Sequence, residues 1–398
     1  MDMSSAEIPA FADAPSRRRI AVLVDPGDAW GRRVILGISG AVRHILPWDL
    51  LIAPRDEQWR FRVPYNWRGD GMIAAIRDDK TAEHVRSLNL PTVHVSLCEK
   101  SQDGRFRVIT DDRKRAEMAF AHFRDRGFWN YAYYGPPDQR YPERRGTVFR
   151  EVVQDAGLAC HIFAMTGPKT DANSLSEQTS LWLKQLPRPL AVFAADPHPA
   201  LRLTEICQAE GIHVPEEVAV LAGDSDDVLC EISDPPLSSI FLASEQIGAE
   251  SVAMLEGLLR NEAPVEASRL IPPIRVVGRQ STDILAVNDP LFVDALRFIR
   301  QNAHQGIQVG DVLRSVPMSR RLLEQRFQQF LFRSPADEIR KVKLERVKQL
   351  LVSTEHSIEQ IAHSSGFSSA SQLSVVFRKA TGQTAQEFRR DKRRNREA

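Results

Sequence analysis

An internal repeat near the end of the chain restricts its fold more than any other feature of the sequence. Residues 312–330, VLRSVPMSRRLLEQRFQQF, align with residues 361–380, IAHSSGFSSASQLSVVFRKA, at an offset of 50 residues. The alignment places Leu323 on Leu373 and Phe327 on Phe377. Each copy has a short helical pattern, a tight turn and a second helical pattern. This order is typical of the helix-turn-helix unit, whose second helix enters the DNA major groove.

The second helix of the first copy has one apolar and one polar face. Its apolar residues follow the i, i+4, i+7, i+8 spacing of a helix with one buried side, and they are Leu323, Phe327, Phe330 and Leu331. The residues left on the outer side are polar, and together with the neighbouring Arg320 they are Arg321, Glu324, Gln325 and Gln328. Such a face is also found on ordinary solvated helices. The repeat favours contact with DNA.

The segment between the two copies predicts an amphipathic helix. Its sequence is SPADEIRKVKLERVKQLL, with apolar residues at Ile339, Leu344, Val347, Leu350 and Leu351. Such a helix can hold both units rigidly, so that their recognition helices meet one face of a duplex about one helical turn apart. Lysines such as Lys341 and Lys348 are expected to be phosphate contacts or solvated charges.

The larger, first part of the chain alternates apolar strands with helical patterns. Residues 19–25, RIAVLVD, form a continuous apolar run of the kind that is buried on both faces of a parallel sheet. Further runs predict strands at 48–53, 71–76, 91–97, 131–135, 161–165, 190–196 and 218–224. Helical patterns lie around 112–126, 142–157, 172–186 and 198–211. The pattern predicts a doubly wound α/β fold that is long enough for two lobes.

Three of the predicted strands end in aspartate, at Asp25, Asp196 and Asp224. Ligands of open parallel sheets bind at the carboxyl ends of the strands, where a carboxylate can accept hydrogen bonds from two neighbouring hydroxyl groups of a sugar. The aromatic residues Trp30 and Trp67 strengthen the prediction of a carbohydrate site. Aspartate is also a common helix N-cap, and Asp196, which precedes a helix, is the most open to that interpretation.

Composition and charge limit the class of protein. The chain has 398 residues, of which 42% are hydrophobic and 26% charged, as in globular proteins of two or three domains. From Leu285 onward it has 20 basic and 12 acidic residues, whereas the preceding part has 33 basic and 40 acidic residues. A basic domain that binds a polyanion is therefore expected beside an acidic domain with another role.

Several other classes are disfavoured. An apolar run of about 18 residues is absent, so no membrane partner is expected. The four cysteines form no CxxC pair, and no metal or nucleotide-binding motif occurs. We therefore expect a cytoplasmic protein without a cofactor or a metal. The predicted division is a disordered tail (1–16), the two-lobed α/β part (17–281), a linker (282–288) and a DNA-binding domain (289–398).

Residues 289–398 resemble the AraC-type DNA-binding domain. The resemblance is carried by GFSSASQLSVVFRKATGQTAQEFRR (366–390), although Ala385 and Leu373 stand where the family usually has Pro and Phe. It implies that the first recognition helix presents Arg321, Glu324 and Gln325 to bases. In the second unit Ser371, Gln372 and Ser374 fall in the corresponding place.

Residues 17–280 are similar to the LacI-type sensor with a periplasmic-binding-protein-like fold. The resemblance is carried by the segments YYGPPDQRYPERRGTVFREVV, VFAADPHPALRLTEICQAEGIHVPEEVAVLAGDSDDVLCEISDPPLSSI and IPPIRVVGRQST. It implies that Arg145 and Asp224 bind the sugar, while Ala195 and Leu242 replace polar residues of the family. A sensor of this type joined to an AraC-type domain is the arrangement of XylR-like transcriptional regulators.

The resemblance implies a sugar-responsive regulator, with xylose or a related sugar as effector, that acts as a homodimer on operator DNA. It also implies activation through RNA polymerase. Two alternatives stay open: a DNA-binding regulator whose sensor is vestigial or serves only dimerisation, and a carbohydrate enzyme that uses paired carboxylates such as Asp224 and Asp226. The second alternative leaves the helix-turn-helix repeat unexplained.

Overall fold

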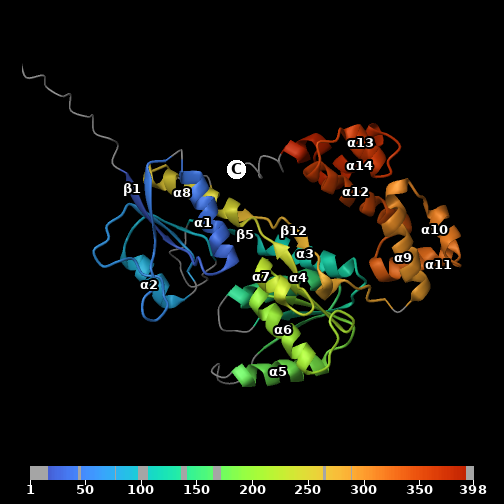
Figure 1. The fold of residues 1–398 in the computed structure, drawn as a ribbon, viewed down its shortest axis with the longest axis horizontal. Helices are drawn as coiled ribbons and strands as arrows, with labels where there is room; N and C mark the ends of the chain where they lie inside the picture. Colours follow the sequence, from blue (N-terminus) through green and yellow to red (C-terminus); the bar gives the residue numbers. More distant parts are fainter. Residues whose placement is uncertain are drawn as a thin grey trace, which may run out of the picture.

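The computed structural model describes residues 17–43, 46–76, 78–96, 106–135, 141–164, 172–262, 266–287 and 289–390. Figure 1 shows two α/β lobes followed by a helical domain at the other end of the molecule. The predicted fold class is confirmed. The expected tail at 1–16, the linker residue Asn288 and the basic residues from 391 onward lie outside the described residues.

The first lobe, which we call the N-lobe, is built on a six-stranded parallel sheet. The strand order is β11-β5-β4-β3-β1-β2. The strands are β1 (Arg18–Leu23), β2 (Trp48–Ile52), β3 (Gly71–Ala74), β4 (Thr92–His94), β5 (Arg107–Thr110) and β11 (Ser268–Ile271). In β1, Ile20 and Val22 face one cluster of buried side chains and Ala21 and Leu23 face another, which explains its continuous apolar sequence.

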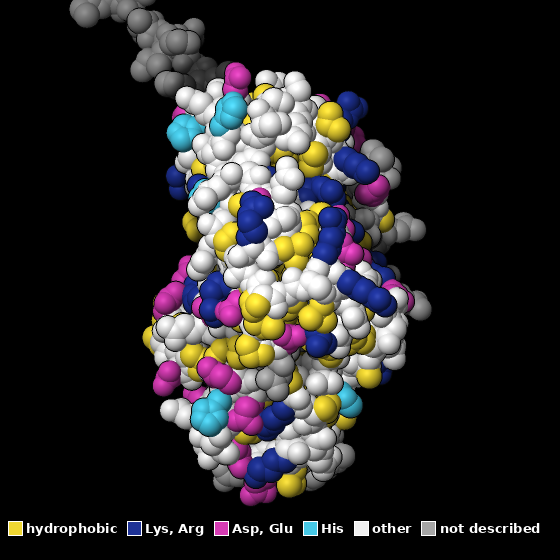
Figure 2. Space-filling view, turned by 90° about the vertical axis from the view of Figure 1, so that its right-hand side faces the viewer, with side chains coloured by type: hydrophobic (Ala, Val, Ile, Leu, Met, Phe, Trp, Pro, Cys, Tyr) yellow, Lys and Arg dark blue, Asp and Glu magenta, His cyan; other side chains and the backbone are white. Residues whose placement is uncertain are grey.

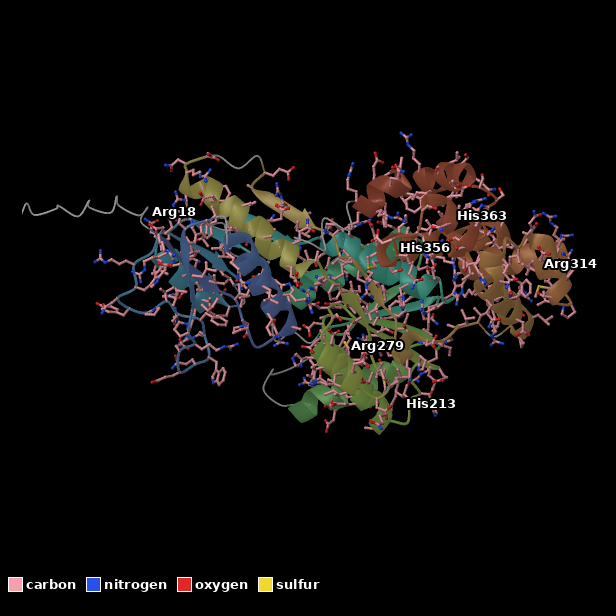
Figure 3. The ribbon with its side chains drawn as sticks, turned by 45° about the horizontal axis from the view of Figure 1, so that its top comes forward. Arg18, His213, Arg279, Arg314, His356 and His363 are labelled. Atoms are coloured by element: carbon pink, nitrogen blue, oxygen red, sulfur yellow. The ribbon has the colours of Figure 1, made fainter. Side chains whose placement is uncertain are left out.

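Three helices cover the N-lobe sheet: α1 (Ala29–Val42), α2 (Asp79–Ser87) and α8 (Ser244–Leu259). Helices α1 and α8 touch through their backbones. A Cβ atom at Gly37 would lie 2.0 Å from the carbonyl oxygen of Glu245, and one at Gly248 would lie 2.2 Å from that of Val34. Glycine at both positions permits this contact. Arg18 of β1 adds an ion pair of 3.1 Å to Glu256 of α8 (Figure 3).

The second lobe, which we call the C-lobe, has the strand order β12-β10-β9-β8-β6-β7, with only β12 antiparallel to its neighbour β10. The strands are β6 (Asn130–Tyr134), β7 (Cys160–Ile162), β8 (Leu190–Ala194), β9 (Val218–Ala222), β10 (Ser238–Phe241) and β12 (Arg275–Val277). Its helices are α3 (Asp112–Arg124), α4 (Tyr141–Asp155), α5 (Ala172–Gln185), α6 (Pro197–Ala209), α7 (Asp227–Ile232) and the 3₁₀ turn η1 (Gln280–Thr282). Helices α3 and α4 cover one face of the sheet, and α5 and α6 cover the other.

The chain passes between the lobes at three neighbouring connections. These connect β5 to α3, β10 to α8, and β11 to β12. The backbone N–H of Asp111 donates to the carbonyl of Ile271 at 2.8 Å, and that of Ile274 donates to Phe241 at 2.9 Å. Hydrogen bonds therefore join the three connections at the boundary between the lobes.

The helical domain contains two clusters of buried side chains that share one long helix. Its helices are α9 (Pro290–Asn302), the 3₁₀ turn η2 (Ala303–Gln305), α10 (Val309–Ser315), α11 (Arg320–Leu331), α12 (Pro335–Ser353), α13 (Ile358–Ser364) and α14 (Ala370–Thr381). Helix α12 contributes Ile339 to the first cluster and Leu344, Val347 and Leu351 to the second. The intervening helix therefore joins the two helix-turn-helix units, as its pattern predicted.

Candidate functional site

Asp224, at the carboxyl end of β9, lies at the boundary between the two lobes. Its side chain is buried and accepts a hydrogen bond from the backbone N–H of Ser225 at 2.6 Å. The Arg33 guanidinium, which comes from α1 of the N-lobe, donates to the same carboxylate oxygen at 3.1 Å. Asp224, which the sequence predicted to bind the sugar, therefore lies where the two lobes meet.

Arg33 makes three contacts with the C-lobe. Besides Asp224, it donates to the carbonyl of Ser225 at 2.8 Å, and its guanidinium lies 5.1 Å from the centre of the Phe241 ring. Its Nε atom is buried without a hydrogen-bond partner among the described residues. Because it has no partner in the part of the chain that the structure describes, this nitrogen remains able to donate to an oxygen atom of a ligand. A buried donor without a partner costs free energy, and such a hydrogen bond would remove that cost.

Arg145 lies on the C-lobe side of the same boundary. It donates to the carbonyl of Ala195 at 2.9 Å, and its Nε lies 3.8 Å from the carboxylate of Asp112. Asp112 also pairs with Arg115, which is 1% exposed and donates to the carbonyl of Gly223 at 3.3 Å. Arg145 and Asp224, the two residues implied by the resemblance, thus belong to one polar cluster.

Burial and charge act differently on the two carboxylates of this cluster. Burial raises the pKa of Asp224 to about 6, although Arg33, the Ser225 N–H, Arg115 and Arg145 each lower it. Burial also raises the pKa of Asp112, but Arg115 and Arg145 outweigh burial and hold that pKa below its ordinary value. Asp112 is therefore a permanent anion that holds the two arginines, whereas Asp224 carries its charge at a free-energy cost.

The remaining sequence-predicted residues of the sensor have different surroundings. Asp25 pairs with Arg55 of the N-lobe and accepts the Gly27 N–H at 2.8 Å. Trp30 packs against the cores of both lobes, as a residue at the boundary should. Asp196 accepts the His198 N–H at 3.2 Å as the N-cap of α6, which agrees with the capping interpretation. Its role as a ligand stays a prediction.

Trp67 does not join these residues. It lies beside Arg19 near the start of β1, with 5.8 Å between the guanidinium carbon and the ring centre. The carboxyl end of β1, where Asp25 follows, is the opposite end of the strand. Asp226, which the enzyme alternative would use, caps α7 by accepting the N–H groups of Val228 and Leu229 at 3.1 Å each.

Sequence reasoning did not identify Arg33, Asp112 or Arg115. Asp112 follows β5, so the rule that selected the other strand-end carboxylates applies to it as well. The short strand RVIT itself was not predicted. Arg33 and Arg115 gave no signal, because an arginine among polar residues at the start of a helix is usually solvated.

The first recognition helix, α11, presents the predicted polar face to solvent. Leu323, Phe327 and Leu331 are buried, and Arg321 and Gln325 are exposed on the opposite side. Gln328 is also exposed. Arg320 and Glu324 form an ion pair of 3.0 Å with each other, so their charges partly offset. Figure 2 views this end of the molecule, where Lys and Arg side chains are spread over the visible face with Asp and Glu side chains among them.

The second recognition helix, α14, buries Leu373 and Phe377 in the same way. Two of its three predicted contact residues already have partners. The side-chain oxygen of Gln372 accepts the N–H and the hydroxyl of Ser368, at 3.0 and 3.1 Å, and the Ser374 hydroxyl donates to the Ala370 carbonyl at 2.8 Å. Ser371 is exposed.

The helical domain contacts the C-lobe through the end of α11 and the start of α12. Phe332 has a left-handed backbone with φ of 55°, and its ring lies 4.7 Å from the Trp129 ring, with the Arg124 guanidinium 4.5 Å from its centre. Asp125 binds Arg333 at 2.8 Å and also pairs with Lys341. Lys341 is therefore engaged with the sensor in this structure.

The segment that joins the domains is packed rather than extended. Ile284 and Ala286 contact the C-lobe core, whereas Leu285 and Val287 contact the core of the first helix-turn-helix unit. Thr282, which precedes them, is fully buried and shares a hydrogen bond of 2.8 Å with His122 of α3. Alternate residues of this segment thus belong to different domains.

In the described part of the chain, no group of three or more His, Cys, Asp or Glu residues is arranged to hold a metal ion. None of its helices is both long and apolar enough to cross a membrane.

Two family models match parts of the chain. Residues 120–282 match the model of a periplasmic binding protein-like domain, and residues 312–391 match a helix-turn-helix domain. The chain is 30% identical over 385 residues to the xylose operon regulatory protein of Escherichia coli K12, covering 94% of this chain and 97% of that protein. It is 31% identical over 382 residues to the protein of the same description from Haemophilus influenzae, with 93% and 98% covered.

Solved structures agree with this assignment. A structure described as the xylose-binding transcription activator xylR has a TM-score of 0.60 and 28% identity, covering 94% of this chain and 98% of that one. A complex of the transcriptional regulator CelR with cellobiose has a TM-score of 0.53 and 20% identity, covering 67% of this chain and 86% of that one, and shows the sensor fold alone.

Proposed function

The chain belongs to the family of the xylose operon regulatory proteins and is a sugar-responsive DNA-binding transcriptional regulator, and from this premise we propose that its effector is xylose or a closely related sugar bound at the lobe boundary. The observation that carries the proposal is the pairing of Asp224 in one lobe with Arg33 in the other. A sugar that occupies this place meets a carboxylate acceptor and guanidinium donors from both lobes.

The chemistry of the cluster suits a neutral polyhydroxy ligand. Asp224 can accept from two neighbouring hydroxyl groups, while Arg145 and the Nε of Arg33 can donate to ring or hydroxyl oxygens. Asp112 offsets the positive charge of Arg115 and Arg145, so the ligand itself need not be an anion. Asp25, Asp196 and Trp30 remain proposed ligand contacts of lower rank, because the first two have other partners.

A sugar bound here would change the angle between the lobes. A ligand held by both lobes favours the arrangement in which it contacts both, and it shifts the equilibrium by its difference in affinity. The three connections between the lobes are hydrogen-bonded to one another, so they can act as a hinge. Helix α3 starts at this hinge and ends at Asp125, which binds Arg333 and Lys341 of the helical domain.

Helix α3 therefore connects the sugar site to the DNA-binding domain. Its first turn carries Asp112 and Arg115, and its C-terminal end contacts Phe332 through Arg124. We infer that closure of the lobes moves this helix and with it the helical domain. Two protomers would then present their recognition helices to paired half-sites of an operator.

We also propose the partners and the cellular location of the protein. The protein acts as a homodimer in the cytoplasm, binds operator DNA and recruits RNA polymerase to promoters of sugar-catabolism genes. We propose that it is not an enzyme, because its relatives are transcription regulators and Asp226, the second carboxylate of the enzyme alternative, is used as the N-cap of α7. The enzyme alternative also gives no role to the helix-turn-helix repeat, whereas a transcriptional regulator uses it to bind DNA.

A thermal-shift screen of the full-length protein against pentoses and hexoses tests the effector. A sugar at 100 times its Kd should stabilise the native protein by about 2.7 kcal/mol. We expect xylose or a close relative to raise the melting temperature of the wild type and to leave that of Arg33→Ala unchanged. Arg17→Ala is the matched control, because Arg17 forms only an exposed ion pair with Asp49. Binding of operator without stabilisation by any sugar would favour a vestigial sensor.

A further inference from the structure

Val375 is a hydrophobic residue on the outer face of the second recognition helix, and its side chain is 71% exposed. It lies two residues after Leu373 and two before Phe377, which are both fully buried. Because each residue advances a helix by about 100°, Val375 lies about 200° from Leu373 and on the side opposite the core. A single exposed valine is ordinary on a protein surface, so its position must be supported independently.

The internal repeat supplies this support. At the offset of 50 residues, Val375 corresponds to Gln325, the exposed residue at the middle of the outer face of α11. Gln372, which the family resemblance placed among the base contacts, corresponds instead to Leu322. The correspondence extends to the backbone, because Ser319 and Ser369 cap the two helices through the same interaction with the third residue after them. Val375 therefore occupies the place in the second unit that Gln325 occupies in the first.

The neighbours of Val375 leave it at the centre of the surface that would meet DNA. Gln372 is held by Ser368 and Ser374 by the Ala370 carbonyl, so two of the polar residues of this helix are directed toward its own backbone turn. Ser371 and Arg378 lie one turn before and about one turn after Val375 and are exposed.

We propose that Val375 contacts the 5-methyl group of a thymine in the half-site bound by the second helix-turn-helix unit. The thymine methyl is the apolar group that bases present in the major groove, and an aliphatic side chain is its natural partner. The inference rests on the DNA-binding function of the family and names the base class that this helix prefers. The first unit, with Gln325 at the same place, should instead prefer an amide-compatible edge such as that of adenine.

Deoxyuridine substitution tests the contact, because it removes only the methyl group. The operator is first selected with the full-length wild-type protein, and each thymine is then replaced in turn by deoxyuridine. Wild type should lose roughly fourfold in affinity at one or two positions, the value for one buried methyl group. Val375→Ser should bind with no loss at those positions, and the control Gln325→Ala should keep the loss.

The outcomes separate this inference from the family function. The thymine contact is overturned if deoxyuridine lowers the operator affinity of wild type and Val375→Ser equally at every position, or lowers it at no position, while operator binding itself persists. Failure of the wild type to select any operator would instead contradict the DNA-binding function. Because Val375 is exposed, the substitution should leave the circular dichroism spectrum unchanged.

Discussion

Replacing Asp224 by Asn should stabilise the sugar-free protein while removing its response to sugar. Burial raises the pKa of this carboxyl group from its ordinary value of 3.8 to about 6. Between these two pH values the folded state binds a proton that the unfolded state has released, so stability falls as the pH rises through this window. Above about pH 6 the folded protein bears the whole free-energy cost of ionising the buried Asp224 carboxyl group.

The size of the effect follows from the shift. A difference of about two pKa units corresponds to about 3 kcal/mol, and this figure already includes the attraction of Arg33. The neutral amide of Asn avoids the cost, so Asp224→Asn should gain up to about 3 kcal/mol at pH 8 and only a small part of that at pH 4. Each kcal/mol raises the melting temperature by about 2–4 °C in a domain of this size.

Calorimetric melting of the sensor at a series of pH values between 4 and 8 measures this gain. Asp49→Asn is the control, because Asp49 forms an exposed pair with Arg17 and should show no such gain. Titration calorimetry with the sugar found in the screen should show no binding to Asp224→Asn. A variant that is no more stable than wild type at pH 8, or a gain that does not depend on pH, would refute the reasoning.

Three further predictions concern the DNA-binding domain. Phe332→Gly should relieve a left-handed conformation that costs a non-glycine residue about 1–2 kcal/mol, but it removes the contact with Trp129. Operator affinity without sugar should persist, and the change in operator affinity on adding sugar should shrink. An undiminished change in anisotropy titrations would argue against coupling through this contact. The fragment 285–398 should fold alone and bind operator with a steep salt dependence, and no retardation of operator at low salt would place the domain boundary elsewhere. In binding-site selection, Gln325→Ala should relax the preference at one or two adjacent base pairs. Lys341 pairs with Asp125 of the sensor and is not the free phosphate contact expected from the sequence, so Lys341→Ala should leave the base preference unchanged. An unaltered profile for both Arg321→Ala and Gln325→Ala would mean that this face is only solvated.

The helical domain could be predicted closely from the sequence because its signals are local. Apolar spacing and serine caps lie within each helix and its first turn, and the repeat shows the same pattern again 50 residues later, so each helix is specified without reference to the sensor. Phe332 is the exception. The second unit has Gly382 at the corresponding C-cap, with φ of 78°, whereas the first has a phenylalanine whose partner, Trp129, lies some 200 residues away. A contact so distant in sequence leaves no local pattern.

The sequence predicted the fold class of the sensor, but its pattern of apolar residues did not predict several of the strands and buried residues. Strand β10 begins with Ser238 and Ser239, which are fully buried because hydrogen bonds from Ser238 to Arg279 and from Ser239 to Ser225 satisfy their hydroxyl groups. A polar strand of this kind lacks an apolar run, so it was expected only through the family resemblance, in the segment that ends in PPLSSI, and not from the pattern of apolar residues. Arg115 likewise is buried only because Asp112 and a backbone carbonyl receive it. Tertiary partners decide such positions.

One measurement tests the central claim, that a sugar bound between the lobes controls how the protein binds DNA. Operator affinity of the full-length protein is measured by fluorescence anisotropy with and without saturating sugar, for wild type and for Asp224→Asn. We predict that sugar changes the affinity or stoichiometry of the wild-type complex and changes neither for Asp224→Asn, which should bind operator as the sugar-free wild type does. An equal response of both proteins to sugar would contradict the account.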